Sequence, residues 1–138
     1  MVAPRLTPIE DAPPSIVSSL PRLPQGPDVQ VFMVVRGGHC QSGRWRVGDV
    51  IVCRGEASTG DDVVLLAGGL GRPQLGRVEG IRLLGVLGEP CHPARWRVAG
   101  KITLTFRQQR DGWMVELRGR APRSVIEGQL SLFSAQAA

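Results

Sequence analysis

Short runs of apolar, largely β-branched residues separated by glycine dominate the middle of the chain. Such runs cover residues 29–35, 45–52, 63–66 and 81–86. The second of them is bent at Gly48-Asp49. Residues 101–107 alternate strictly between polar and apolar side chains, and residues 113–118 do so roughly. Alternation is typical of strands, whereas no stretch sustains the 3.6-residue period of a capped helix. The pattern predicts a mainly β domain over residues 28–120.

A hairpin and two flanking segments complete the predicted organisation. Asp111-Gly112 lies between the last two alternating runs, and Asp-Gly is a strong signal for a tight hairpin turn. Residues 1–27 hold seven of the eleven prolines. Proline removes backbone donors, so we expect a disordered, proline-rich N-terminal arm, with local docking open to Ile16-Val17. Residues 121–138 are small, polar and turn-prone around one apolar pentapeptide, and predict a flexible C-terminal tail.

Composition narrows the class of protein. The 138 residues are 42% hydrophobic, which is enough for one domain with a core. No apolar stretch approaches the length of a membrane span, and no signal peptide is recognisable at the N-terminus. Three cysteines without an export signal favour reduced thiols and a cytoplasmic location. No motif for a cofactor is present, and we expect none.

The net charge of +5 is unevenly placed. Residues 1–69 carry six Arg and seven Asp or Glu, a balance of −1, whereas residues 70–138 carry eleven Lys or Arg and five Asp or Glu, a balance of +6. This asymmetry is compatible with contact to nucleic acid or an acidic partner, and equally with a solvated surface. The arginines around the predicted hairpin that would contact nucleic acid are Arg107, Arg110, Arg118, Arg120 and Arg123.

The segments 35–40, 47–53 and 60–65 hold Val-Arg-Gly-Gly-His-Cys, Val-Gly-Asp-Val-Ile-Val-Cys and Gly-Asp-Asp-Val-Val-Leu. Their order resembles the C-terminal domain of LexA, UmuD and phage repressors, the S24 peptidase-like fold. The resemblance covers roughly residues 30–105 and implies a twisted β-sheet fold. It also implies a serine nucleophile, a lysine base and dimerisation, so a homodimer is compatible with it.

The chain departs from that family at both catalytic positions. Alignment by spacing places His39 where the family has serine, with Cys40 beside it, and places Gly76 where the family has lysine. The sole lysine, Lys101, falls on another predicted strand, and we expect Ser42 to be turned away from the cleft. A serine hydroxyl needs a nearby base to become a nucleophile. We therefore expect a pseudo-peptidase, with a divergent peptidase that uses Cys40 or Ser42 as the alternative.

Two pairs of histidine and cysteine leave a further chemistry open. His39-Cys40 and Cys91-His92 could together supply four tetrahedral zinc ligands, and Cys40 with His92 could act as nucleophile and base. Adjacent residues of a strand point to opposite faces, which is awkward for a shared metal. Ordinary buried cysteines and surface histidines are therefore favoured over a metal site.

The apolar pentapeptide of the tail is Gln-Leu-Ser-Leu-Phe, residues 129–133. It matches the motif by which many bacterial DNA polymerases and repair factors bind the β sliding clamp of DNA polymerase III. Leu132 and Phe133 would fill one hydrophobic pocket, Gln129 would fix the register, Leu130 would occupy a smaller depression, and Ser131 would be a spacer. The alternative is a terminal edge strand, but the pentapeptide has no β-branched residue.

Together the two resemblances predict a non-catalytic accessory protein of bacterial DNA repair or translesion synthesis, within the SOS response to DNA damage. Its partners would be the sliding clamp at the replisome and a second protein, such as a translesion polymerase. DNA contact would be indirect or weak, because three Trp, three Phe and no Tyr offer little base stacking. A nucleic-acid-binding β module remains a further alternative.

Overall fold

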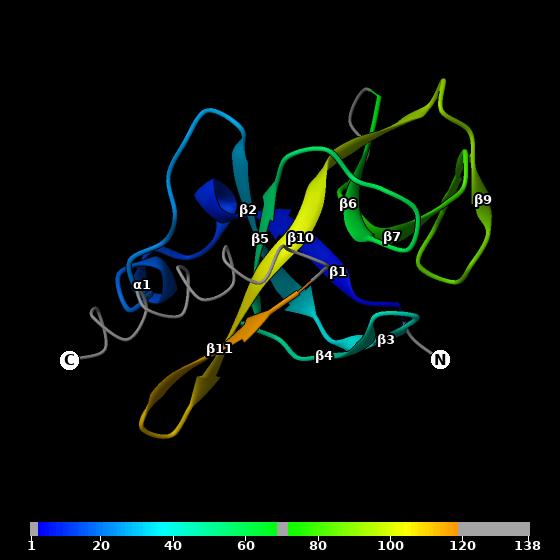
Figure 1. Ribbon diagram of the computed structural model, residues 1–138. Coiled ribbons are helices and arrows are strands. Elements are labelled where there is room, and N and C mark those ends of the chain that lie inside the picture. Colours follow the sequence, from blue (N-terminus) through cyan, green and yellow to red (C-terminus); the bar gives the residue numbers. More distant parts are fainter. Residues whose placement is uncertain (1–2, 69–71, 119–138) are drawn as a thin grey trace.

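The structure is a computed structural model that describes residues 3–68 and 72–118. Within them the chain is mainly β, with one curled antiparallel sheet and a small two-stranded one (Figure 1). The helical elements are short: η1 (Ile9–Asp11) and α1 (Pro14–Val17). The strands are β1 (Arg5–Pro8), β2 (Val29–Arg36), β3 (Gly38–Cys40), β4 (Gly43–Trp45), β5 (Val50–Arg54), β6 (Asp62–Ala67), β7 (Gln74–Glu79), β8 (Arg82–Leu84), β9 (Pro90–Cys91), β10 (Trp96–Gln109) and β11 (Gly112–Leu117).

The long strand β10 joins two groups of strands. The sheet order is β1-β2-β5-β10-β6-β7-β8-β9, so β5 and β6 are separated by β10 although they follow one another in the chain. The first part of β10 pairs with β6, its middle pairs with β5, and its last part pairs with β11. The register shifts beside Gly100, where an added Cβ would lie 2.9 Å from the Arg54 amide nitrogen. Glycine therefore allows β10 to pass close to β5 at the point where its partner changes.

Apolar side chains cover both faces of the sheet. One cluster is drawn from both groups of strands and includes Leu6, Phe32, Trp45, Ile51 and Leu75. A second cluster is centred on Met33, Val50, Leu104 and Phe106 of β2, β5 and β10. A third, smaller one lies among β6, β7 and β9. The apolar members of the alternating run 101–107 are all buried: Ile102 belongs to the first cluster, and Leu104 and Phe106 belong to the second.

The N-terminal segment departs from the arm expected over residues 1–27. Its β1 pairs with β2 in the main sheet, and Leu6 is only 1% exposed. Ile9, Ile16, Leu20 and Leu23 pack against the second cluster, and Trp113 of β11 donates a hydrogen bond to the Ser19 carbonyl at 3.0 Å. The physical reason is that these apolar residues cover a sheet face that would otherwise be exposed to water.

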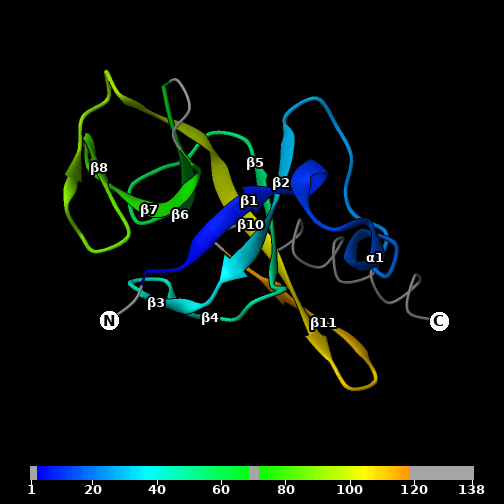
Figure 2. The same ribbon diagram turned by 180° about the vertical axis from the view of Figure 1, so that it is seen from behind.

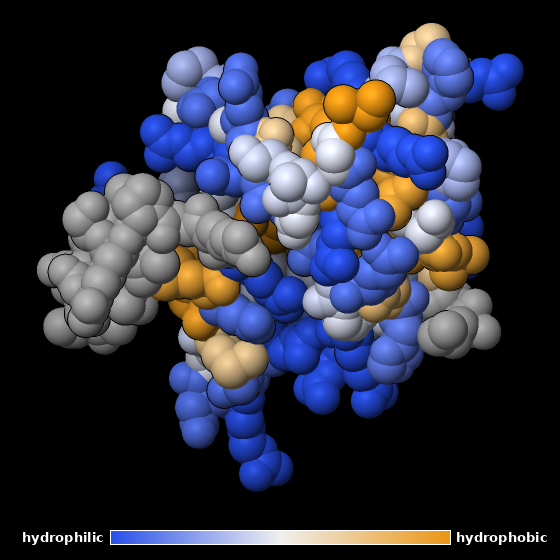
Figure 3. Space-filling view, turned by 45° about the vertical axis from the view of Figure 1, so that its right-hand side comes forward, coloured by the Kyte–Doolittle hydropathy of each residue, from blue (hydrophilic) through white to orange (hydrophobic). Residues whose placement is uncertain are grey.

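The predicted strands agree with the structure in most places. The runs at 29–35 and 63–66 correspond to β2 and β6, and the predicted hairpin at Asp111-Gly112 joins β10 and β11. The run at 45–52 is divided, because Trp45 ends β4 and β5 begins only at Val50. The hairpin extends away from the rest of the sheet, with hydrophilic side chains at its tip (Figure 3).

The described residues contain no helix long and apolar enough to cross a membrane. The predicted tail, residues 121–138, lies outside the described residues.

Candidate functional site

A small hollow lies where the resemblance places a catalytic site. Its volume is about 10 Å³, which is room for about one water molecule. One side is formed by residues 40–42, which connect β3 to β4, and the other side by β6, β7 and the segment after β8. The lining residues on that other side are Asp62, Leu75, Gly76, Gly85 and Val86.

Ser42 lines this hollow, contrary to the expectation that it would be turned away. It lies in the tight turn between β3 and β4, where Cys40 is the register partner of Gly43. The Ser42 hydroxyl lies 2.9 Å from the Cys40 sulfur and accepts a hydrogen bond from the Trp45 indole N–H, also at 2.9 Å. Ser-Gly is a recognised turn signal, and it would have indicated this hairpin from the sequence.

His39, the residue at the expected serine position, does not line the hollow. It is exposed and is the register partner of Arg44 in the two-stranded sheet. Neighbouring side chains of a strand point to opposite faces, so β3 turns Cys40 toward the hollow and His39 away from it. Of the two residues at and beside the expected serine position, the β3–β4 hairpin therefore places Cys40 at the hollow and His39 outside its lining.

Gly76, which the resemblance aligns with a lysine, is closed to any side chain. A Cβ atom there would lie 2.5 Å from the Leu84 carbonyl oxygen and 2.6 Å from a methyl carbon of Leu65. The first of these is a backbone atom of the neighbouring strand β8, so it cannot rotate aside. A lysine could not occupy position 76 while β7 and β8 are packed as they are in the structure.

The two residues of the chain that could serve Ser42 as a lysine or carboxylate base are Lys101 and Asp62. Lys101 lies in β10, opposite Arg54 and Val63, and is not among the lining residues. Asp62 does line the hollow, but its carboxylate accepts a hydrogen bond from the Arg77 Nε at 3.1 Å. The hydrogen-bond partners of the Ser42 hydroxyl are therefore Cys40 and Trp45, and no lysine lies in the hollow.

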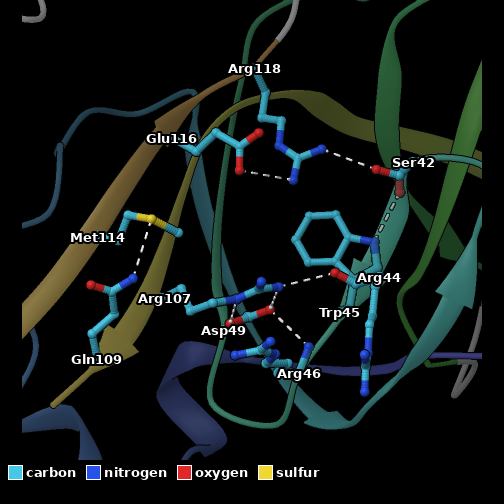
Figure 4. A network of polar contacts seen from close by, with 10 residues as sticks. All are labelled: Ser42, Arg44, Trp45, Arg46, Asp49, Arg107, Gln109, Met114, Glu116 and Arg118. Carbon is cyan, nitrogen blue, oxygen red and sulfur yellow. Dashed lines mark hydrogen bonds and ion pairs between the residues drawn. The ribbon is translucent and has the colours of Figure 1, made fainter.

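A polar network built around Asp49 lies near the contacts of Ser42 (Figure 4). The Asp49 side chain is 3% exposed and accepts two hydrogen bonds from the Arg107 guanidinium, at 3.0 and 2.7 Å. The Arg46 backbone N–H donates a third at 2.8 Å, and Arg107 also donates to the Arg44 carbonyl. The hydrogen bonds that Arg107 donates to Asp49 raise the pKa of Arg107. This pair fixes the turn before β5 against β10.

Arg118 connects this network to the hollow. Its guanidinium carbon lies 5.0 Å from the centre of the Trp45 ring, a cation–π distance. It also donates hydrogen bonds to the Ser42 carbonyl at 3.1 Å and to Glu116 at 3.4 Å, as Figure 4 shows.

Two of the arginines predicted to contact nucleic acid have protein partners. Arg107 binds the Asp49 carboxylate and the Arg44 carbonyl, and Arg118 contacts the Ser42 carbonyl, Glu116 and the Trp45 ring. Arg110 lies in the exposed turn of the hairpin. Arg120 and Arg123 lie outside the described residues.

The two pairs of histidine and cysteine are not brought together as a metal site. Among the residues that the structure describes, no group of three or more His, Cys, Asp or Glu side chains is placed to hold a metal ion. Cys91 is buried beside Gln74 and the Glu89 carbonyl, and His92 accepts a hydrogen bond from the Ala94 N–H. Burial raises the pKa of the Cys91 thiol, and raises that of Cys53 to about 12. Neither is a thiolate at neutral pH.

The predicted clamp-binding residues 129–133 lie outside the described residues. Comparison of the chain with models of known protein families, with curated proteins and with solved structures finds no match.

Proposed function

We propose that this protein is a non-catalytic adaptor of bacterial DNA repair or translesion synthesis. In this role, residues 129–133 bind the β sliding clamp and the β domain binds a second protein, such as a translesion polymerase. The observation that carries the proposal is the pentapeptide Gln-Leu-Ser-Leu-Phe, with two adjacent apolar anchors and a register-fixing glutamine.

The hollow beside Gly76 supports the non-catalytic part of the proposal. A peptidase of the related family needs a serine and an uncharged lysine in contact. Ser42 lines the hollow without a lysine beside it, and the backbone of β8 fills the space that a side chain at position 76 would need. The remaining surface of the β domain is then available for binding rather than for hydrolysis.

Clamp binding is the first test. The full chain should bind a bacterial β sliding clamp with a dissociation constant on the order of micromolar, which corresponds to a binding free energy of about −8 kcal/mol. The affinity is modest because a short peptide orders few residues and buries little area. Replacing Leu132 and Phe133 together with alanine should abolish the complex. Calorimetric titration measures the affinity, and Ser131→Ala is the matched control, expected to bind like wild type.

Thermal unfolding distinguishes recruitment from a structural strand. If the double variant binds the clamp as well as wild type does, the pentapeptide is not the clamp ligand. If the double variant instead melts at a much lower temperature than wild type, residues 132 and 133 belong to the core of the fold. In that case, too, the proposal that the pentapeptide recruits the protein to the clamp is wrong.

Self-cleavage is the second test. The chain should remain intact at alkaline pH and with activated RecA, because position 76 supplies no lysine and the Asp62 carboxylate in the hollow is paired with Arg77. Gel electrophoresis or mass spectrometry over several hours would reveal a shorter product. A product that disappears on Ser42→Ala or Cys40→Ala would establish the divergent peptidase in place of the adaptor.

A further inference from the structure

A groove of about 470 Å³ runs along the free side of β1. It is lined by residues 5–8 of β1, by Asp11 and Val35, and by Arg72 and Pro73, which lead into β7. It is distinct from the hollow beside Gly76, since the two have no lining residue in common. It is also much the larger of the two spaces.

Two arginines, Arg5 and Arg72, line this groove. Arg5 is the register partner of Arg36 in the β1–β2 pair, and like charges opposite one another weaken a sheet. The pKa of Arg5 is lowered by the positive charge of Arg72 and then by that of Arg36. None of the four ion pairs among the described residues includes these three arginines. Arg36 instead donates to the Ala3 carbonyl, at 3.0 and 3.3 Å. None of the three arginines is therefore ion-paired within the described part of the chain, although Asp11 also lines the groove.

The backbone of β1 adds a second kind of binding group. β1 is the end strand of the main sheet and pairs only with β2 among the described residues, as Figure 2 shows from the side where β1 lies in front. The unpaired edge of an end strand can accept a further strand from another protein. Pro8 has no N–H, so the available edge is short and ends there. Val35, 41% exposed, and Pro73 add apolar contacts beside it.

We propose that this groove binds an acidic, extended segment of a partner protein, which adds to the edge of β1 and places its carboxylates against Arg5 and Arg72. The segment would alternate acidic and apolar residues, because successive side chains of a strand point to opposite sides. The lining contains no aromatic ring on which nucleobases would stack, which favours a peptide over single-stranded nucleic acid.

This inference rests on the proposed adaptor role, because it describes the chemistry of the second partner. The test uses the full chain and a fluorescein-labelled ten-residue peptide that alternates glutamate with valine or threonine. Fluorescence anisotropy at low salt should show saturable binding that weakens as salt is added. The same peptide with glutamine in place of glutamate should bind at least about tenfold more weakly.

Charge-reversal variants locate the site. Arg5→Glu and Arg72→Glu should each weaken the acidic peptide by about tenfold or more. Arg82→Glu, an exposed arginine of β8 that does not line the groove, is the matched control and should bind as wild type. Arg5→Glu removes a repulsion, so its melting temperature should be equal to or above that of wild type, and a loss of binding could not then be attributed to unfolding.

Backbone methylation tests strand addition. Successive N–H groups of an extended peptide point to opposite edges, so N-methylation at odd positions and at even positions should differ. One set should remove binding and the other should spare it. Equal effects from both sets would overturn strand addition, even if charge matters.

Three further results would overturn the proposal as a whole. These are no binding of the acidic peptide up to about 1 mM, equal binding of the glutamine peptide, and tighter binding of a labelled ten-nucleotide oligothymidylate that is lost in Arg72→Glu. Clamp affinity is measured on the same variants. Retained clamp binding with no peptide binding refutes the groove alone, whereas peptide binding without clamp binding refutes the adaptor role.

Discussion

Replacing Asp49 with alanine should lower the free energy of unfolding by about 3–5 kcal/mol, the range for removing one partner of a buried ion pair. The variant loses all three hydrogen bonds to the Asp49 carboxylate. It also leaves the guanidinium of Arg107, 25% exposed, without its charged partner. Urea denaturation measures the change, provided that the slope of the transition is unchanged.

An exposed ion pair of the same protein is the natural control. Asp28 and Arg54 are 3.4 Å apart, with side chains 51% and 60% exposed, so Asp28→Ala should cost about 0–1 kcal/mol. Adding Arg107→Met to the Asp49 variant should recover part of the loss, because neither charge is then left alone. If Asp49→Ala costs no more than Asp28→Ala does, the network of Figure 4 does not stabilise the fold.

Replacing Gly76 with alanine should destabilise the protein by about 1–3 kcal/mol, as overpacking of a filled site does. The new methyl group would meet the Leu84 carbonyl oxygen at 2.5 Å, and the sheet would have to move to admit it. Gly76→Lys should destabilise at least as much and should yield no cleavage product, although it introduces the residue type that the resemblance to S24 peptidases implies at this position. Thermal unfolding and gel electrophoresis provide the two measurements.

Gly68 offers a matched glycine in open surroundings. The nearest atom to an added Cβ there is the Arg95 carbonyl oxygen, at 3.9 Å, so Gly68→Ala should change stability by no more than about 0.5 kcal/mol. A Gly76→Ala variant as stable as wild type would contradict the closed packing. A cleavage product from Gly76→Lys would show that the hollow can be converted to a peptidase site.

Local patterns predicted the strands well where one chemical signal dominates. The β-branched run before Arg36 became β2, and Asp111-Gly112 became the turn of the β10–β11 hairpin, because both depend on neighbouring residues alone. The run at 45–52 was predicted to bend at Gly48-Asp49, and β4 and β5 are separated by that turn, where Gly48 has a φ of +92° and the Arg46 N–H donates to the Asp49 carboxylate. The hydrogen bonds of Asp49 with Arg107, 58 residues later in the chain, are what no local pattern contains.

The N-terminal segment and the site show the same limit. Seven prolines in residues 1–27 argued for an arm separate from the sheet, yet Leu6 and Ala12 are buried. Proline content predicts the local backbone conformation. It does not predict that the N-terminal segment packs against the apolar face formed by β2, β5 and β10. At the site, the absence of lysine at position 76 was evident from the sequence. The orientation of Ser42 and the Arg5–Arg72 groove depend on segments brought together by the sheet.

The place of β10 between β5 and β6 has a consequence for folding during synthesis. The strands made earlier form two sets, β1-β2-β5 and β6-β7-β8-β9, which do not pair with each other. The register partners of β10 in β5 lie about 50 residues earlier in the chain. Their pairing must close a long loop, which costs chain entropy, and we therefore expect it to be slow. A ribosome-bound chain that ends before Trp96 should therefore expose the unpaired edges of β5 and β6, and should bind chaperones until β10 has left the exit tunnel.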